Sequence, residues 1–231
     1  FLMFMLDSFH TALAREVNMT ITGNVNNDKD VIGKKCYEMM KQMYTKNYSE
    51  MLNIFYGIQM SVIERLHPES NPDGTSENDR AVSFSTDNIL SLSPEPFSII
   101  SLSIPLVEIP DTGKTRIPTL YDCFAHYCEG ERMEGDNAWF NDKTKQYQSV
   151  QKRIMYWSLP NIMIIDLKRV QYTEHGPVKV NIPVDIPLNN LDLSSFVRGY
   201  KRDSYIYDLY AVCNHHGNFS KSGHYTATIR S

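Results

Sequence analysis

The sequence has no apolar stretch long enough to cross a membrane. Its opening run, Phe1–Leu6, is apolar, but Asp7 and His10 follow at once, and a spanning helix needs roughly 20 apolar residues. No basic region precedes the run, as one would in a secretory signal. We therefore expect no membrane association, and a place in the cytoplasm, the nucleus or both.

Basic residues are not in excess, and cysteine is sparse. The net charge is −4 and no long basic run occurs, so nothing in the sequence favours nucleic-acid binding. The four cysteines match neither paired C-x-x-C zinc ligands nor the framework of a small disulfide-rich protein, and we expect free thiols. The chain also shows no internal repeat, coiled coil or low-complexity tract. The cysteines are Cys36, Cys123, Cys128 and Cys213.

The 231 residues suffice for one large domain or two small ones, and the N-terminal part is expected to be helical. Apolar residues three and four apart predict a first helix with one buried face. A polar, Asn-rich loop over Thr20–Asp30 then leads to a second amphipathic helix. Ser49 and Thr119 are each expected to cap a further helix. The apolar positions are Leu2, Leu6, Phe9, Leu13 and Val17 in the first helix, Cys36, Met39, Met40, Met43 and Tyr44 in the second, Leu52 and Phe55 after Ser49, and Leu120, Cys123, Phe124 and Tyr127 after Thr119.

The C-terminal third consists of short β-rich segments separated by turn residues. This spacing predicts an antiparallel sheet rather than regular βαβ units, and an α+β class for the whole chain. The partial alternation of Phe97–Ile104 also suits a strand, while the polar segment His67–Arg80 suits an exposed tip or insertion. The expected C-terminal strands are Ile154–Trp157, Ile162–Ile165, Val178–Ile182 and Tyr205–Cys213.

The last residues contain the only clustered histidines, His215, His216 and His224. His224 follows Gly223 at the mouth of a strand, where a histidine is well placed for proton transfer near neutral pH. Gly223 has no Cβ, so a ligand backbone could approach closely there. Judged from the residues alone, however, a loop or strand-end histidine without a catalytic role is the more common case. A metal site is disfavoured, because no helical H-x-x-x-H pattern accompanies the cluster.

A histidine base needs a group to activate, and a thiol is the natural candidate. Cys36 stands beside Lys34 and Lys35, which could lower a thiol pKa. It also falls on the apolar face of its expected helix, which favours a buried structural cysteine. Cys213 lies on a strand that ends near the histidines, and we expect a structural placement for it too.

The segment Leu209–Arg230 resembles the histidine box of the ubiquitin-specific proteases, a family of cysteine deubiquitinases. That box contains an Asn-His-x-Gly turn, matched by Asn214–Gly217, and a Gly-His-Tyr-Thr-Ala strand, matched by Gly223–Ala227. Further motifs match in family order over nearly the whole chain, and this collinearity makes the resemblance specific. They lie at Phe1–Leu13, Ser49–Ser61, Leu120–Phe124, Leu159–Arg169 and Leu191–Phe196, with Val170 where the family usually has phenylalanine.

The resemblance implies a papain-like cysteine protease fold with thumb, palm and fingers. Residues 1–231 would form a single catalytic domain that is incomplete at both ends. Residues 1–55 would be thumb helices, 56–150 mostly fingers with a helix near 119–128, and 151–231 mostly palm. The domain would be monomeric.

The resemblance also implies an activity, the hydrolysis of the bond at the C-terminal glycine of ubiquitin. His224 would be the general base that takes the proton of a cysteine thiol. Gly223 and Tyr225 would flank the channel for the diglycine tail, and Asn214, His215 and Gly217 would belong to the same substrate-binding box. The partners would be ubiquitin and ubiquitylated proteins, and no cofactor would be needed.

Two features depart from the family pattern. Family members often bind zinc in the fingers through two C-x-x-C pairs, but those positions here are Arg65 with Pro68 and Asn141 with Thr144. None of these residues is a thiolate ligand, so we expect a metal-free finger tip.

The second departure concerns the nucleophile. The family's cysteine box, Gly-x-Thr-Cys-x-x-Asn, does not occur in the sequence, and Cys36 follows the first helix, in the wrong order for that box. We therefore reject Cys36 as the nucleophile, and we expect the sequence to be a fragment of a longer protease that carries its cysteine upstream. The alternative is a catalytically inactive, ubiquitin-binding pseudoenzyme. The retained His224 favours the enzyme.

Overall fold

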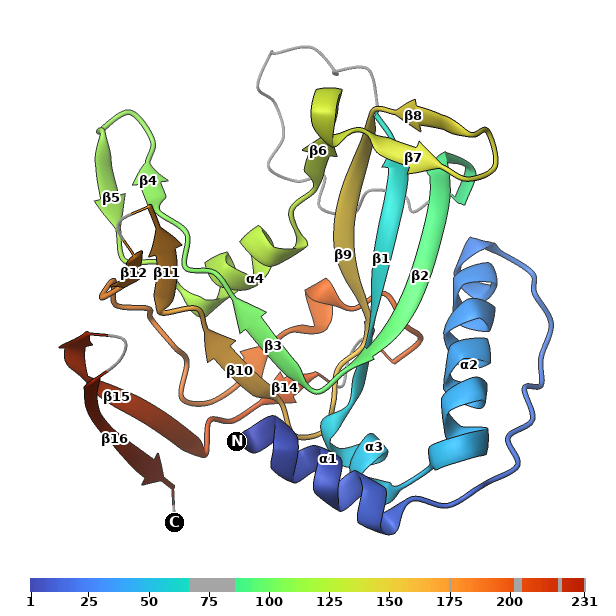
Figure 1. The fold of residues 1–231 in the computed structure, drawn as a ribbon, viewed down its shortest axis with the longest axis horizontal. Coiled ribbons are helices and arrows are strands. Elements are labelled where there is room, and N and C mark those ends of the chain that lie inside the picture. The colour runs from blue at the N-terminus through green and yellow to red at the C-terminus, as the bar shows by residue number, and fades with distance from the viewer. Residues whose placement is uncertain (67–85, 175, 202–204, 220–221, 231) are drawn as a thin grey trace. The chain divides into compact units, whose positions relative to one another are not determined.

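The computed structural model describes residues 1–66, 86–174, 176–201, 205–219 and 222–230. They form two compact units, whose elements are drawn in Figure 1. The expected polar tip, His67–Arg80, falls outside the described residues. Unit 1 comprises Phe1–Ser98, Glu129–Ile162 and Val197–Tyr200, and unit 2 comprises Ile99–Cys128, Met163–Phe196 and Lys201–Ser231.

Unit 1 contains a four-stranded antiparallel sheet. Alternate residues of its strand β1, Ile58, Met60 and Val62, are buried, as the two-residue period of a strand requires when one face meets a core. A short hairpin, β7 (Trp139–Asn141) with β8 (Gln146–Gln148), belongs to the same unit. The sheet has the order β2 (Ile89–Phe97), β1 (Gly57–Arg65), β9 (Val150–Ser158) and β6 (Glu131–Met133).

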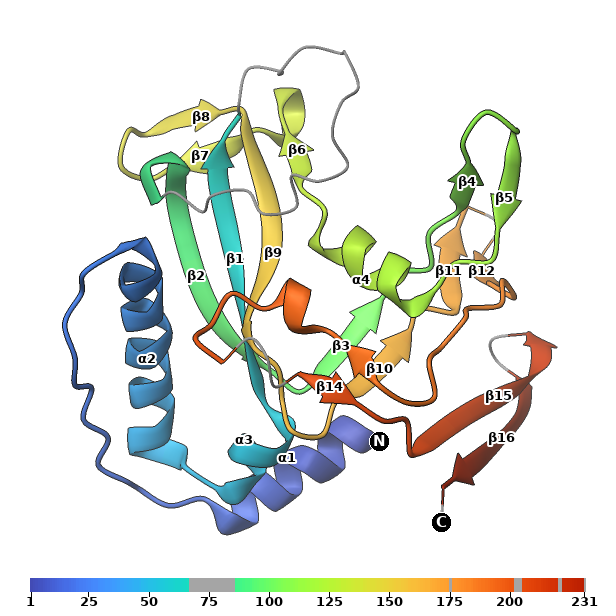
Figure 2. The same ribbon diagram turned by 180° about the vertical axis from the view of Figure 1, so that it is seen from behind.

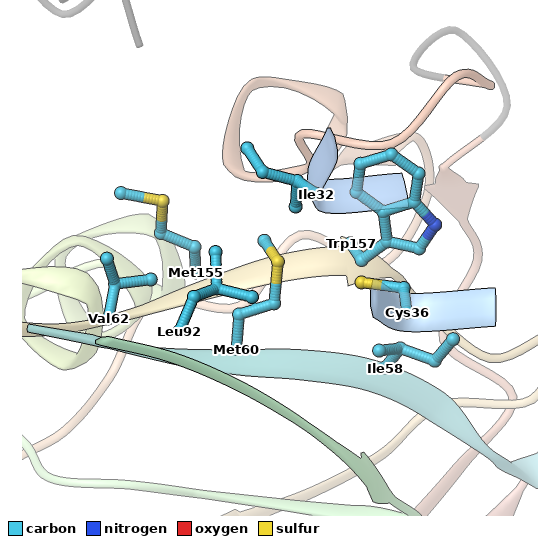
Figure 3. Close-up of a cluster of buried hydrophobic side chains, with 8 residues drawn as sticks. All are labelled: Ile32, Cys36, Ile58, Met60, Val62, Leu92, Met155 and Trp157. Carbon is cyan, nitrogen blue, oxygen red and sulfur yellow. The ribbon is translucent and has the colours of Figure 1, made fainter. Parts of the chain in front are cut away.

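Helix α2 (Asp28–Asn47) lies along this sheet in both views (Figures 1 and 2). It begins where the side chain of Asn27 accepts a hydrogen bond from the backbone N–H of Asp30, a normal N-cap. The expected second helix is therefore confirmed, but its first residues, 28–30, belong to the segment that was expected to be a loop. The core between α2 and the sheet, shown in Figure 3, consists of Ile32, Cys36, Ile58, Met60, Val62, Leu92, Met155 and Trp157.

Helices α1 (Leu2–Leu13) and α3 (Glu50–Phe55) depart from the sequence prediction in their side-chain contacts. The single buried face expected for the first helix is wrong, because Leu6 is its one buried residue. The helix ends before Val17, since the backbone turns extended at Ala14 and Arg15 pairs with Tyr48. Leu2, Phe9 and Leu13 are about half exposed.

Ser49 precedes α3 at the N-cap position, as expected, but its hydroxyl makes no capping hydrogen bond. The fully buried Ser49 Oγ instead lies 2.7 Å from Nδ1 of His10 on α1. The exposed Arg15 and Glu50 form an ion pair between the same two segments. The serine was thus correctly placed at a helix start, and its partner lies far away in the sequence.

Unit 2 has small, separate sheets rather than one. Strands β3 (Ile99–Leu102) and β10 (Ile164–Leu167) pair in parallel, an exception to the expected antiparallel arrangement, which the other described strand pairs of the C-terminal third confirm. Residue periodicity does not encode strand direction, and the long segment between the two strands provides the crossover that a parallel pair needs. Helix α4 (Leu120–Cys128) confirms the helix expected after Thr119, whose hydroxyl accepts the N–H of Asp122.

Three expected strands have different bounds in the structure. The segment Phe97–Ile104 is broken at Ser98, because β2 and β3 belong to different sheets. The segment Val178–Ile182 contributes only the end of β12 (Gly176–Lys179), which pairs with β11 (Val170–Thr173). Tyr205–Cys213 is divided between two strands that pair with different partners. The remaining strands of unit 2 are β4 (Val107–Ile109), β5 (Lys114–Arg116), β13 (Leu191–Asp192), β14 (Ile206–Tyr207), β15 (Ala211–Phe219) and β16 (Ser222–Ile229).

The structure is therefore a mixed α/β fold with mostly antiparallel strand pairs and few helices. Among the described residues, no helix combines the length and the apolar character needed to cross a membrane. All four cysteines are free, as expected.

Candidate active-site hairpin

The histidine cluster lies on an antiparallel hairpin formed by β15 and β16, the two C-terminal strands in Figure 1. His216 pairs with His224, and His215 pairs with Tyr225. The expected turn at Asn214–Gly217 is wrong, because these residues belong to β15 and Asn214 pairs with Thr226. The strand continues past the motif to Phe219, and the register shifts between His216 and Phe219.

The two glycines of the motif allow the strands to approach closely at this shift. Gly217 has φ 142° and Gly223 has φ 158°, values that side-chain-bearing residues rarely adopt. A Cβ at Gly223 would overlap the backbone oxygen of His216 and the ring of His215. A Cβ at Gly217 would lie 2.8 Å from the backbone oxygen of Ser222. Both positions therefore need glycine for the hairpin itself.

The strand pairing divides the predicted site residues between two faces. Side chains alternate along a strand, and directly opposed residues share a face. His224 and Asn214 therefore lie on one face of the hairpin, while His215 and Tyr225 lie on the other. On the second face, the rings of His215 and Tyr225 stack at a centroid distance of 4.8 Å.

The face of His224 includes two residues that the sequence analysis did not assign to the site. His216 lies directly opposite His224, and its Nε2 is 2.8 Å from the hydroxyl oxygen of Thr226. His224 itself is exposed, so its imidazole can be reached by a substrate and by a thiol. The sequence places His216 and Thr226 inside the motif, but only the strand register shows that they share a face with His224.

Neither thiol that the sequence analysis weighed suits the imidazole of His224. Cys36 is fully buried in the core of unit 1, and burial raises its pKa to about 12, so it remains a neutral thiol near pH 7. Its predicted burial is confirmed. Cys213 pairs with Ala227 and is exposed, but this pairing places it on the face of His215 and Tyr225.

Two of the four positions at which the family often has zinc ligands, Asn141 and Thr144, lie in a hydrogen-bonded turn. Asn141 is buried, and its Oδ1 accepts the backbone N–H groups of Lys143 and Thr144. Its Nδ2 donates to Oε1 of Gln148 on β8. Arg65 ends β1, and Pro68 lies outside the described part of the chain. No group of His, Cys, Asp or Glu in the described residues is arranged to hold a metal ion.

Comparison with known proteins assigns the family. The model of the ubiquitin carboxyl-terminal hydrolase family matches residues 1–231. The chain belongs to this family. Its resemblance to the ubiquitin-specific proteases is therefore confirmed.

Individual ubiquitin carboxyl-terminal hydrolases match about half of the chain. Ubiquitin carboxyl-terminal hydrolase 9 of Arabidopsis thaliana is 33% identical over 131 residues, which cover 53% of this chain and 14% of that protein. Ubiquitin carboxyl-terminal hydrolase 8 of the same plant is 36% identical over 132 residues, covering 54% and 15%. Human ubiquitin carboxyl-terminal hydrolase 19 is 39% identical over 114 residues, covering 48% and 9%. The matched part is thus a small fraction of each relative.

Proposed function

We propose that this chain is part of a thiol-dependent deubiquitinase, in which His224 is the general base. The observation that supports this most directly is the β15–β16 hairpin, which presents an exposed His224 in a chain that the ubiquitin carboxyl-terminal hydrolase family model matches over its whole length. The substrates would be ubiquitin conjugates, cleaved at the isopeptide or peptide bond after the C-terminal glycine of ubiquitin. The same proposal includes the division of the domain into thumb, fingers and palm. It also includes a monomeric state and a cytoplasmic or nuclear location.

The chemistry proceeds through an acyl intermediate. The imidazole of His224 takes the thiol proton, and the thiolate attacks the carbonyl carbon of the C-terminal glycine. The carbon–nitrogen bond then breaks, the leaving amine takes the proton from His224, and ubiquitin remains as a thioester. Water attacks the thioester carbon while His224 accepts one of its protons. The carbon–sulfur bond then breaks, the proton on His224 passes to the sulfur and restores the thiol, and the new carboxylic acid gives its proton to solvent. The carboxylate of ubiquitin is released.

The nucleophile is assigned to a cysteine of the whole protein that lies outside the 231 residues. Cys36 and Cys123 are fully buried, and burial raises the pKa of both thiols. Cys128 is half-buried on α4, and Cys213 faces away from His224. None of the four meets the requirement for an accessible thiol within hydrogen-bond reach of the base.

The test uses the whole protein and a fluorogenic amide of ubiquitin as substrate. We expect turnover by the wild type, a loss of at least about 10²-fold in His224→Ala because general base catalysis contributes that much, and little change in His126→Ala, whose exposed imidazole lies on α4. A ubiquitin derivative with a C-terminal electrophile should label one cysteine. Binding of ubiquitin without turnover or labelling would instead support the pseudoenzyme. Full activity in His224→Ala would refute the mechanism.

A further inference from the structure

The side chain of Lys179 connects a neighbouring hairpin to the histidine hairpin. Lys179 is the last residue of β12, is half-buried, and belongs to the same unit as β15. Its Nζ donates to the backbone oxygen of His215 at 3.0 Å and to that of Gly217 at 2.6 Å. Both bonds are charge-assisted, which makes them stronger than hydrogen bonds between neutral groups.

The two carbonyl groups flank the residue opposite His224. Carbonyl groups of alternate residues point to the same edge of a strand, so those of His215 and Gly217 face the outer edge of β15. In the described residues β15 pairs only with β16, and this outer edge carries no further strand. Between the two carbonyls stands His216, the direct partner of His224. Lys179 therefore supports the backbone of β15 on both sides of His216, the residue that pairs with His224.

The backbone around Lys179 is held in place by contacts with β11 and with the segment that precedes it. Lys179 pairs with Val170 in the β11–β12 hairpin. The guanidinium group of Arg169 donates to the backbone oxygens of Val180 and Ile182, the residues that follow β12. The backbone N–H of Lys168 donates to the oxygen of Leu102 at 2.8 Å, which ties this segment to the parallel pair β3–β10. Hydrogen bonds and the short chain segments between them thus link β3 to the histidine hairpin.

We propose that Lys179 is a positioning residue for His224, and this inference rests on the proposed role of His224 as base. Without the ammonium group, two outward carbonyls of β15 lose their protein donor, and this part of the hairpin loses its support from β12. Proton transfer requires a heavy-atom separation of about 2.6–3.2 Å, so a shift of about 1 Å weakens catalysis strongly. Substrate contacts of the same hairpin tolerate such a shift better, so binding should change by a smaller factor than the rate.

The test replaces Lys179 by methionine, which keeps an unbranched side chain but removes the donor, and by arginine, which can still donate to two carbonyls. In the whole protein, Lys179→Met should lower kcat by about 10- to 100-fold, with KM changed by a smaller factor. Lys179→Arg should recover most of kcat. Lys114→Met is the matched control, because Lys114 is an exposed lysine on β5 of the same unit, and it should behave as wild type.

Hydrogen exchange on the same variants separates positioning from general stability. We expect faster exchange of β15 and β16 amides in Lys179→Met and unchanged exchange in β3 and β10. Unchanged kcat in Lys179→Met would overturn the inference. Faster hydrogen exchange in β3 and β10, in addition to β15 and β16, would also overturn it, because the substitution would then destabilise the whole unit. Should His224→Ala prove fully active, the proposed function fails, while the exchange experiment still decides whether Lys179 holds the hairpin.

Discussion

Replacing Gly223 by alanine tests how closely the position of His224 depends on the hairpin backbone. The added methyl group would overlap the backbone oxygen of His216, directly across from His224. It would also overlap the ring of His215. The imidazole can rotate away, whereas the backbone oxygen cannot move without separating β15 from β16. The strands must therefore part at the pair that contains the proposed base.

The expected magnitude follows from the geometry. Carbon and oxygen ordinarily approach no closer than about 3.3 Å, and relieving the overlap with His216 requires a displacement of about 1 Å. A displacement of that size at a reacting group costs about 10²-fold in rate, or about 2.7 kcal/mol of transition-state stabilisation. The positive φ of Gly223 adds a backbone cost of about 1–3 kcal/mol for any side-chain-bearing residue.

Steady-state kinetics on a fluorogenic ubiquitin amide provide the assay. We expect kcat of Gly223→Ala to fall by about 10²-fold and KM to change by a smaller factor, because the displaced base is more sensitive to a shift of about 1 Å than the contacts with the ubiquitin tail. Gly113→Ala is the matched control: Gly113 also has positive φ, 62°, but a Cβ there meets no atom within 4 Å. Wild-type kcat in Gly223→Ala would refute this reasoning. A rise in KM alone would show instead that the glycine admits the ubiquitin tail.

Three further predictions concern the surrounding structure. Asn141→Ala should reduce the unfolding free energy by about 1–3 kcal/mol in denaturant unfolding, because its buried side chain makes three hydrogen bonds in the β7–β8 turn. A chelator should leave the melting temperature of the wild type unchanged. In native protein, a thiol reagent should modify the exposed Cys213 but leave Cys36 unmodified, because burial raises the pKa of Cys36 to about 12; mass spectrometry of digested protein reads this out, and native labelling of Cys36 would contradict it. Asp122 accepts hydrogen bonds from Arg116 and Thr119, which hold the pKa of this carboxyl well below its usual value of about 3.9, so its stabilisation is complete above that pH and is lost as the pH falls toward the lowered pKa. Denaturant unfolding from pH 6 to pH 2 should therefore show a smaller acid loss in Asp122→Asn than in wild type, and equal losses would contradict this.

The sequence predicted helix starts and buried helix faces well where these depend on residues close in the chain. It predicted the pairing of strands that are distant in the chain less well. Ser49 and Thr119 each precede a helix as predicted, because helix starts depend on residues within one turn. The start of α2 at Asn27 was missed, since it lies inside the segment Thr20–Asp30 that was expected to be a loop. The parallel pairing of β3 with β10 could not be derived, since strand direction is set by the connection between strands and not by their residues. The burial of Cys36 followed from its apolar helix face, whereas the exposed side chains of α1 depend on what covers that helix.

At the candidate site, too, the sequence motif identified the residues, whereas the pairing of the strands could not be predicted from it. The motif identified His224 and its neighbours but treated them as a turn with a histidine beside it. In the structure the same residues are paired strands, and a strand places successive side chains on opposite faces. A ubiquitin tail that approaches on the face of His224 would therefore meet the side chains of Asn214, His216 and Thr226. It would meet Gly223 and Tyr225 through their backbone alone.

This arrangement gives the glycines and Lys179 related structural roles. His224 is exposed, and its position is set mainly by the backbone on which it stands. The close approach at Gly223 fixes the spacing between β15 and β16, and the contacts of Lys179 support the outer edge of β15. At the other end of the hairpin, Arg230 donates to the oxygen of Tyr210 and to Oδ1 of Asn189. Because these contacts hold the backbone on which His224 stands, a substitution such as Lys179→Met, at a position outside the proposed substrate-binding box, should still change catalysis strongly.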